Sequence, residues 1–201
     1  MVAPAFRVRS VALTNQWVTL EPLRPTHAPD LFHAGHRHPD LEFQPTPPFT
    51  KTMDAVNWVT GALDDQLAGR RVPFAIIDPI AKVAVGSTSL FDFRPAERAL
   101  EIGYTWITPT SQRTPINTAA KLLLLTHCFE TLRCERVQLK TDARNTRSQR
   151  AIERLGARRE GVLRRHMKLY DGFVRDSVFY SILSAEWPTV KTSLESRLDR
   201  K

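Results

Sequence analysis

The alternation of hydrophobic and polar residues predicts four strands in the first half of the chain. Residues 16–23, 72–78, 82–93 and 98–107 are rich in β-branched and aromatic residues and form alternating or short apolar runs. The turn at residues 78–81 lies between the second and third of these segments, so the two are expected to form a hairpin.

Two helices and one irregular loop are expected between these strands. Residues 27–38 read as a short helix, and residues 52–69 as a longer one with Thr52 as its N-cap. The apolar residues of the longer helix recur near helical spacing at Met53, Val56, Val59, Leu63 and Leu67. Three prolines within residues 45–49 exclude regular structure there, which predicts a loop or lid.

Helices and strands alternate in the second half. Helices are predicted over 115–132, 145–156 and 188–199, and strands over 136–142, 161–170 and 173–183. Asp171-Gly172 is a strong signal for a two-residue hairpin between the last two strands.

A strand–helix–strand unit in the middle of the chain determines the predicted topology. If strands 98–107 and 136–142 share a sheet, the helix that crosses between them requires them to be parallel. The predicted fold class is therefore α+β, with a mixed sheet and helices on both faces. We expect one domain over residues 1–201, with a core of about 16–187 and a C-terminal helix of about 188–199.

The amino-acid composition argues against some classes of protein but does not indicate a particular function. The chain has 201 residues, 42% hydrophobic and 25% charged, and no apolar run approaches the roughly 18 residues of a membrane span. The N-terminus lacks the apolar region of a secretory signal. Cys128 and Cys134 are too few for a disulfide framework, so core thiols in a cytoplasmic protein are expected. The net charge of +8 favours anionic partners without choosing among them.

The stretch "SQRTPINTAAKLLLL" has two interpretations. Thr114 suits an N-cap and Pro115 suits the first helical position, which indicates a well-capped helix. A helix N-terminus also presents free N–H groups and a positive dipole end. Gln112 and Arg113 lie at the same spot, so a phosphate group could bind there.

The strand at 98–107 is expected to have one core face and one face with open space. By strict alternation, the core face carries Leu100, Ile102, Tyr104 and Trp106. Glu101 lies on the other face with the small residues Gly103 and Thr105, which leaves room beside a potential base. Further along, Asn145 and Ser148 lie three residues apart at a helix start, where they either bind a ligand or cap the helix.

Four motifs together resemble the GNAT superfamily of N-acetyltransferases. They are "EIGY", "NTAAKLLLL", "RNTRSQRAIERLGA" followed by "EGVLR", and "DGFVRDSVFYSIL". The sequence is most similar to the RimJ/RimL-type branch, which includes ribosomal-protein N-terminal acetyltransferases, over about residues 16–187. The resemblance implies a mostly antiparallel twisted sheet with a splayed parallel pair, here strands 98–107 and 136–142. Acetyl-CoA is expected to bind in the gap between them.

The resemblance also implies a set of cofactor-binding residues. Trp106, Ile107 and Thr108 would pair with the pantetheine arm through their backbone. The pyrophosphate would lie on the turn at residues 112–117, where the family has Gln/Arg-x-x-Gly-x-Gly/Ala. The donors and polar groups expected there or at the next helix start are Gln112, Arg113, Thr114, Ile116, Asn117, Thr118, Asn145 and Ser148.

Two residues depart from that turn pattern. Pro115 replaces a glycine and removes one N–H donor, while Asn117 replaces a small residue. Losing one donor of several costs roughly 1–2 kcal/mol, and Arg113 could compensate electrostatically. Acetyl-CoA binding is therefore expected to be weakened without being abolished.

The implied reaction is direct attack of a neutral amine on the thioester. Glu101 is the candidate base, acting through a water, or else it holds a cationic substrate or pairs with an arginine. A backbone N–H near Ile107 would polarise the carbonyl. Many relatives protonate the thiolate with a tyrosine, but Ile152 occupies that position, so Ser148 or solvent would serve instead.

The basic composition raises the question of which anionic partner the chain binds. Arg147, Arg150 and Arg154 share a helical face that could meet a cofactor phosphate or an acidic protein, or could simply be solvated. Nucleic acid is not favoured, because no aromatic residues interleave with the arginines. His33, His36 and His38 lack a metal-ligand pattern, so no metal is expected.

The expected acceptor is an amine, most simply the N-terminal α-amine of a protein. An acidic protein N-terminus would suit the basic charge of this chain. A homodimer is compatible with the sequence. Phe43, Phe49 and Trp58 are candidates for the acceptor pocket, although Trp58 also suits the core. The main alternative is a weak or inactive GNAT-like domain that binds coenzyme A or an acidic partner.

Overall fold

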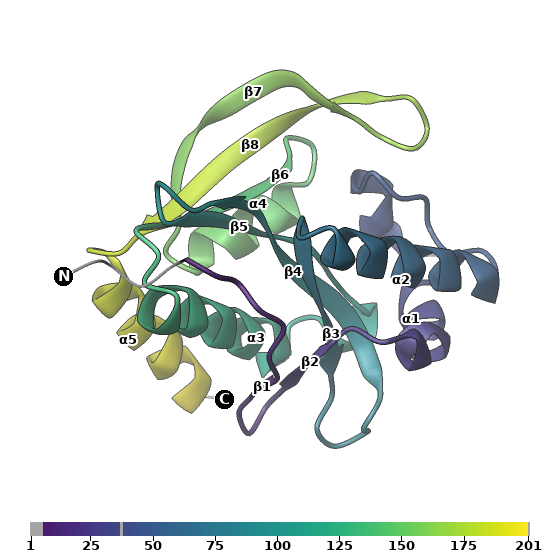
Figure 1. Cartoon of the computed structure of the whole chain (residues 1–201), viewed down its shortest axis with the longest axis horizontal. Coiled ribbons are helices and arrows are strands. Elements are labelled where there is room, and N and C mark those ends of the chain that lie inside the picture. Colours follow the sequence, from purple (N-terminus) through teal and green to yellow (C-terminus); the bar gives the residue numbers. More distant parts are fainter. Residues whose placement is uncertain (1–5, 37, 201) are drawn as a thin grey trace.

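An eight-stranded mixed sheet forms the centre of the computed structural model, which describes residues 6–36 and 38–200 (Figure 1). The strands are β1 (Leu13–Thr14), β2 (Thr19–Pro22), β3 (Arg71–Ile77), β4 (Ala84–Arg94), β5 (Ala99–Ile107), β6 (Arg136–Asp142), β7 (Arg158–Lys168) and β8 (Val174–Leu183). Their order in the sheet is β1-β2-β3-β4-β5-β6-β8-β7. Among these strands, β5 and β6 pair in parallel and all other neighbours pair antiparallel, as the sequence predicts.

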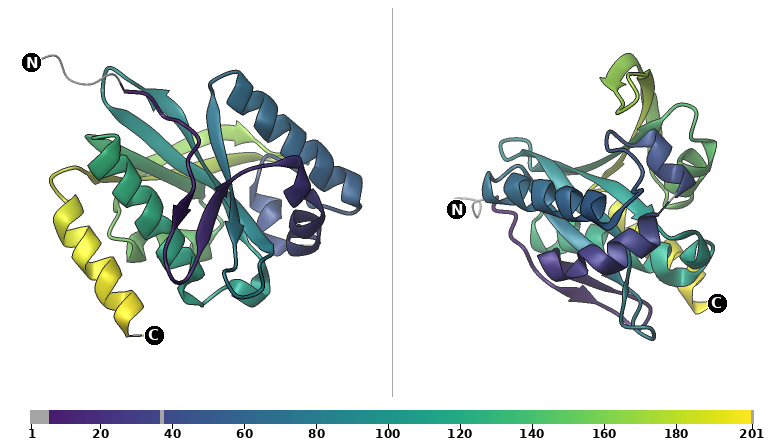
Figure 2. Two further views of the ribbon diagram at one scale, coloured as in Figure 1. Left: turned by 60° about the horizontal axis from the view of Figure 1, so that its bottom comes forward. Right: turned by 90° about the vertical axis from the view of Figure 1, so that its right-hand side faces the viewer.

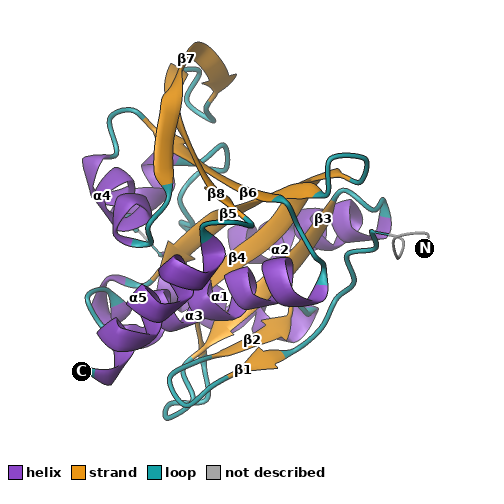
Figure 3. Ribbon diagram, turned by 90° about the vertical axis from the view of Figure 1, so that its left-hand side faces the viewer, coloured by secondary structure: helices purple, strands orange, loops and turns teal. Residues whose placement is uncertain are grey.

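Helices cover both faces of the sheet (Figures 2 and 3). They are α1 (Ala28–Gly35), α2 (Thr52–Leu67), α3 (Pro115–Thr126), α4 (Thr146–Arg154) and α5 (Trp187–Asp199). Short 3-10 turns lie at Pro25–His27, Pro39–Phe43 and Pro109–Ser111, and a π-helical turn, His127–Thr131, extends α3. Helices α1 and α2 pack on one face, and α3 and α5 pack together on the other. The predicted α+β class is confirmed.

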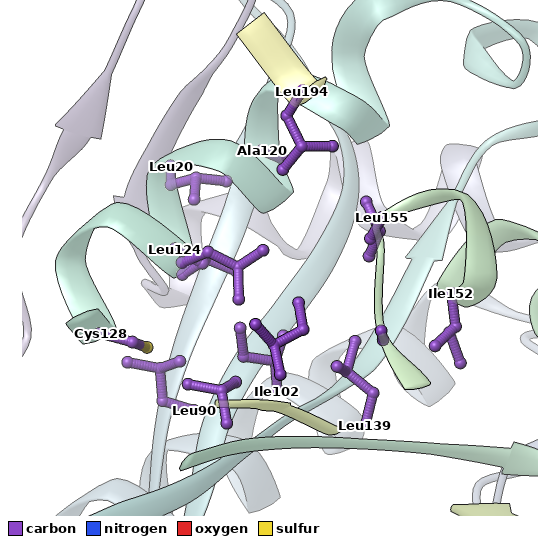
Figure 4. Close-up of a cluster of buried hydrophobic side chains, with 14 of the residues drawn as sticks. Leu20, Leu90, Ile102, Ala120, Leu124, Cys128, Leu139, Ile152, Leu155 and Leu194 are labelled. Carbon is purple, nitrogen blue, oxygen red and sulfur yellow. The ribbon is translucent and has the colours of Figure 1, made fainter. Parts of the chain in front are cut away.

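Two hydrophobic clusters fill these layers. The larger one joins the sheet to α3, α4 and α5, and includes Leu90, Ile102, Leu124, Leu139 and Leu194 (Figure 4). Cys128 belongs to this cluster and Cys134 lies in it as well; both thiols are free and buried, as predicted. The smaller cluster joins α1 and α2 to the sheet around Phe49, Trp58 and Trp106.

The first predicted strand, at 16–23, is wrong in its extent. Within it only Thr19–Pro22 forms a strand, β2, which pairs with the unpredicted strand β1 in a small hairpin. The turn between them forms because Asn15 Oδ1 accepts hydrogen bonds from the N–H groups of Trp17 and Val18, at 3.0 and 3.1 Å. An asparagine side chain that replaces a backbone acceptor in this way stabilises a turn, and this ends β1 at Thr14.

The predicted alternation along β5 is correct only as far as Gly103. Leu100 and Ile102 lie in the α3-side cluster as expected, but Trp106 lies in the α1/α2-side cluster. A bulge causes the change, since Ser87 pairs with Trp106 while Ser89 pairs with Gly103. The extra residue inverts the side-chain direction beyond Tyr104, whose φ of 49° is left-handed.

The hairpin of β7 and β8 projects beyond the rest of the sheet (Figure 1). The predicted turn at Asp171-Gly172 is confirmed, with Gly172 at a φ of 88° that favours glycine. The loop between the strands is longer than two residues, because β7 ends at Lys168 and β8 begins at Val174. The hairpin places β8 residues beside the open end of β6.

Candidate active site

A cleft opens where the two parallel strands stop pairing. Their register contains only three pairs, from Ala99–Arg136 to Glu101–Gln138, although both strands continue beyond. The cleft has a volume of about 810 Å³ and is lined by residues of β5, β6, α3, α4 and the loop after the Pro39–Phe43 turn. This is the size of a site for a substantial ligand. The splay that the resemblance implies is present.

The N-terminus of α3 forms one wall of this cleft. Thr114 is the N-cap: its Oγ1 accepts a hydrogen bond from Ile116 N at 3.3 Å and donates one to Ser111 O at 2.7 Å. Pro115 takes the first helical position, as predicted. The interpretation as a well-capped helix is confirmed. Asn117 and Thr118 still face the cleft, so the anion-binding interpretation also stays open.

Arginines stand at the mouth of the cleft beside this helix end. Arg113, Arg147, Arg150 and Arg154 all line it, the last three from the shared face of α4. Arg147 Nη1 donates to Gln112 Oε1 at 2.8 Å and so links α4 to the turn before α3. The mouth therefore combines a helix N-terminus with several cations, an arrangement that favours phosphate groups.

The end of β5 is hydrogen-bonded by side chains and by the neighbouring strand. Ile107 O accepts from His38 Nε2 at 2.7 Å and from Gln112 Nε2 at 3.2 Å. Thr108 N donates to Val85 O at 2.8 Å. His38 is buried, and burial is the largest cause that lowers the pKa of its imidazole. Much of the polar backbone at this strand end is thus engaged within the protein itself.

The start of α4 lies across the cleft from α3. Asn145 is its N-cap, and Asn145 Oδ1 accepts from Ser148 N at 2.9 Å. Asn145 therefore caps the helix, while both residues also line the cleft. Ile152 lies one turn further along the helix and is buried against the core, so an apolar side chain stands where the resemblance leads us to expect a tyrosine.

Glu101 is the carboxylate at the base of the splay. Its exposed fraction is 1%. Its Oε2 accepts hydrogen bonds from Lys140 Nζ and from Gln138 Nε2, both at 2.8 Å. No hydrogen bond to Oε1 is present within the described residues. The expected open space beside Glu101 is filled on one side, since a Cβ on Gly103 would lie 2.7 Å from the Phe91 ring. Glu101 pairs with a lysine, whereas the sequence suggested an arginine.

Lys121 is a buried cation that the sequence analysis did not single out. It points from α3 to β5, where Lys121 Nζ donates to Thr105 Oγ1 at 2.7 Å and to Thr88 Oγ1 at 3.4 Å. Burial lowers the pKa of this ammonium to about 7. The sequence did contain a signal for it. Lys121 follows Thr114 and Thr118 at helical spacing and is the single lysine in an apolar run, where a buried charge requires a partner or a function.

Two more basic residues lie on the β8 side: Arg175, which lines the cleft, and Arg144, which is not among its lining residues. Arg175 Nη1 donates to Phe43 O at 2.8 Å and its Nε donates to Ser177 Oγ at 3.0 Å. Arg144 binds the buried Asp142 carboxylate at 2.7 and 3.1 Å, and its guanidinium stacks on Phe173 at 3.8 Å. Arg175 thus connects the end of the Pro39–Phe43 turn to β8, and Arg144 connects the segment after β6 to the β7–β8 loop.

Most of the predicted site residues line this one cleft. Those that do are Glu101, Trp106, Ile107, Gln112, Arg113, Thr114, Asn117, Thr118, Asn145 and Ser148. Thr108 and Ile116 do not, since the first bonds to β4 and the side chain of the second is core. Phe43 lines the cleft, whereas Phe49 and Trp58 are core. The lining residues that sequence reasoning missed include Tyr104, Lys121, Lys140 and Arg175.

Neither a metal site nor a membrane-spanning helix occurs in the described part of the chain. No group of three or more His, Cys, Asp or Glu side chains there could hold a metal ion. No described helix combines the length and the apolar character needed to cross a bilayer.

Comparison with known proteins identifies the family. Residues 18–158 match the model of the acetyltransferase (GNAT) domain. The chain is 36% identical over 102 residues to the Bacillus subtilis protein named "Putative ribosomal N-acetyltransferase YdaF". That alignment covers 51% of this chain and 55% of YdaF, so the chain spans about half the length of this curated relative.

Two solved structures share the fold over nearly the whole chain. A GCN5-related N-acetyltransferase from Brucella melitensis is 29% identical, with a TM-score of 0.89 over 97% of this chain and 88% of that one. RimJ from Mycobacterium smegmatis, solved in complex with CoA-disulfide, is 24% identical with a TM-score of 0.77. That match covers 90% of this chain and 88% of RimJ.

Proposed function

Because the chain belongs to the family of acetyltransferase (GNAT) domains, we propose that it transfers an acetyl group from acetyl-CoA directly to a primary amine. The observation that carries this proposal is the cleft between β5 and β6, which begins where their pairing ends at Glu101 and Gln138. The acceptor we propose is a protein N-terminal α-amine.

The residues of the cleft fit acetyl-CoA in two respects. The N-terminus of α3 offers Asn117 and Thr118 beside Arg113 and Arg147, which suits a pyrophosphate. The gap between the splayed strands then provides a channel for an extended arm, with Ile107 at its edge. Acetyl-CoA supplies an acetyl thioester, whose acetyl group passes to a neutral amine as the carbon–sulfur bond breaks.

Glu101 is the proposed general base. An α-amine has a pKa of about 7.7–8.0 and is partly neutral near pH 7, so it needs modest help to lose its proton. The Glu101 carboxylate is fixed by Lys140 and Gln138 through Oε2, which leaves Oε1 to accept that proton through a water. A role limited to orienting the acceptor is the alternative for the same carboxylate.

Ser148 is the proposed acid for the leaving thiol. It lies at the first turn of α4, where its N–H bonds to Asn145 and its side chain lines the cleft. Ile152 cannot donate a proton, whereas Ser148, one turn before it on α4, carries a hydroxyl, and solvent is the alternative source. A coenzyme A thiol is a fair leaving group, and a hydroxyl of ordinary acidity is adequate for this role.

The name of one relative supports the proposed acceptor. YdaF is named as a ribosomal N-acetyltransferase, and ribosomal proteins present N-terminal α-amines. The basic charge of this chain disfavours polycationic acceptors such as polyamines. A cytoplasmic location and a homodimer stay predictions from the sequence.

Turnover with a matched peptide pair tests the proposal. The purified protein is incubated with acetyl-CoA and a short peptide, and free thiol release is followed together with the peptide mass. A gain of one acetyl group on the free N-terminus, absent from the same peptide with a blocked N-terminus, supports α-amine transfer. Acetylation of the blocked peptide on a lysine would contradict it.

A coenzyme A-binding domain without turnover is the second candidate. It is favoured by Pro115, which removes one donor from the α3 turn, and by Ile152, which replaces an acid. Calorimetric titration with acetyl-CoA separates the candidates: binding without thiol release for any amine supports this second function.

A further inference from the structure

Two buried arginines have no carboxylate partner within the described part of the chain. Arg175 is 5% exposed, and its hydrogen bonds go to neutral oxygens, those of Phe43 and Ser177. Its Nη2 makes no hydrogen bond there, although Arg175 lines the cleft. A guanidinium removed from water in this way needs an anion more than an exposed one does.

Arg71 is the second of these arginines and is also 5% exposed. Its Nε donates to Ser89 Oγ at 2.7 Å, and its guanidinium lies 3.9 Å from the Tyr104 ring centre and 5.2 Å from that of Trp58. Its Nη2 is buried and has no hydrogen-bond partner among the described residues. Tyr104 separates Arg71 from the cleft, so Arg71 acts there through its charge.

The charged residues involved share one face of the sheet. Phe91 pairs with both Arg71 and Glu101, and Glu101 pairs with Gln138, two residues before Lys140. Lys140 pairs in turn with Phe179, which alternation places on the same face as Arg175. This is the α1/α2 face, opposite the α3 helix whose N-terminus is the proposed phosphate site.

The buried charges of this face do not balance. Glu101 is paired with Lys140, and Asp142 with Arg144. Arg71 and Arg175 add two positive charges without an ion pair of their own among the described residues. Burial lowers the pKa of both guanidiniums most, although the charges of Asp142 and Glu101 raise the pKa of Arg175 and that of Asp65 raises the pKa of Arg71. His166, which hydrogen-bonds Ser177, responds to this excess: burial lowers the pKa of its imidazole most, and the charges of Lys140 and Arg175 lower it further. The charged groups of this face therefore give it a net positive charge beside the cleft.

We propose that the acceptor carries a carboxylate close to its reactive amine, and that the Arg175 guanidinium binds this carboxylate. This inference rests on the proposed function and specifies its acceptor as a peptide with an acidic side chain beside its N-terminus. Arg175, whose Nη2 makes no hydrogen bond to any described residue, lines the same cleft as Glu101, so one acceptor in this cleft could contact both residues. The net positive charge also favours the neutral, nucleophilic form of the amine and disfavours polycationic acceptors.

A structural role for Arg175 is the competing explanation. Its bond to Phe43 O ties the end of the Pro39–Phe43 turn to β8, across 132 residues of sequence. Loss of that bond would disturb the cleft for every acceptor alike. Binding of a carboxylate would instead make the effect of an Arg175 substitution depend on the charge of the acceptor.

The test compares two peptides on three proteins. The peptides begin Ser-Asp and Ser-Asn and are otherwise identical and neutral. The proteins are the wild type, Arg175→Gln, and Arg164→Gln as a matched control, because Arg164 is an exposed arginine on the same hairpin. The wild type is expected to favour the Ser-Asp peptide by about tenfold or more in kcat/KM. Arg175→Gln should remove most of this preference, and Arg164→Gln should keep it.

Each remaining outcome decides between the explanations. Equal losses for both peptides in Arg175→Gln, or no preference in the wild type, would overturn the proposal. Faster acetylation of free aspartate than of either peptide would indicate that the acceptor is a free amino acid, and would overturn the assignment of a peptide acceptor.

A binding measurement separates this inference from the proposed function. Each peptide is titrated calorimetrically into the protein saturated with coenzyme A. Selective binding of the Ser-Asp peptide that is lost in Arg175→Gln would uphold the inference even if no peptide is acetylated. Absence of selective binding would overturn it even if acetyl-CoA binds and other amines are acetylated.

Discussion

The Glu101 carboxylate and the Lys140 ammonium form a buried ion pair, 2.8 Å from Oε2 to Nζ, at the point where β5 and β6 separate. The Lys140 side chain is 14% exposed and that of Glu101 is 1% exposed. A pair in this position fixes the direction of the carboxylate while its second oxygen remains unused. The same pair makes each partner costly to remove alone.

Removing Lys140 alone should destabilise the fold more than removing both partners. Lys140→Met leaves a buried carboxylate with Gln138 as its only donor, which is expected to cost about 3 kcal/mol of unfolding free energy. The double change Glu101→Gln/Lys140→Met should recover most of this loss, since no charge is then buried. Urea denaturation of the four proteins of the cycle measures the coupling. Strictly additive losses would show that the two groups act independently.

Glu101→Gln should slow transfer to an α-amine in a pH-dependent way. If Glu101 is the base, kcat/KM falls by about a hundredfold at pH 7. The defect should shrink toward pH 9, because an α-amine with a pKa of about 8 is by then already neutral. The measurement is the pH profile of kcat/KM, with Glu97→Gln as a control, because Glu97 is exposed in the turn between β4 and β5. A defect of constant size would assign Glu101 an orienting role instead.

Pro115→Ala should tighten acetyl-CoA binding. The change returns an N–H group to the first turn of α3, where Thr114 already engages the N–H of Ile116. One added hydrogen bond to a charged phosphate is worth roughly 1–1.5 kcal/mol, or about a tenfold lower Kd. Calorimetry with acetyl-CoA measures it, and the binding of adenosine, which lacks the pyrophosphate, should show no such gain. An unchanged Kd would place the phosphates elsewhere than this turn.

The hydrophobic periodicity and the motifs of the sequence were sufficient to predict that β5 and β6 are parallel and that a site lies between them. The strand–helix–strand arrangement around α3 requires β5 and β6 to be parallel, and motif positions place Glu101, Asn145 and Ser148 at one site. These features depend on local periodicity and short spacing. That is why they could be predicted without the structure.

The features that were missed depend on contacts between distant segments. The bulge that moves Trp106 to the other cluster is set by the register of β5 against β4, which no periodicity within β5 reveals. Arg175 reaches the cleft because the hairpin places it beside Phe43, far away in the sequence. Lys121 was visible as a lone lysine in an apolar run, but its partner Thr105 was not.

Lys121→Met should stabilise the protein, and by more at low pH than at high pH. Burial lowers the pKa of Lys121 to about 7 in the folded chain, against about 10.4 when unfolded. Between these values the unfolded chain binds one more proton than the native protein, so stability rises with pH across this window. Below about pH 7 both states are charged, and the cost of burying the ammonium is fully present.

The expected gain for Lys121→Met is therefore largest near pH 6, on the order of 2–4 kcal/mol, and small near pH 10. Thr105 and Thr88 keep their mutual hydrogen bond of 2.8 Å in the variant, so no hydroxyl loses its last partner. Urea denaturation at both pH values measures the difference between wild type and variant. Lys168→Met, which removes an exposed lysine, should show no such trend. An equal gain in unfolding free energy at both pH values would mean that Lys121 destabilises the protein through the packing of its side chain and not through its buried charge.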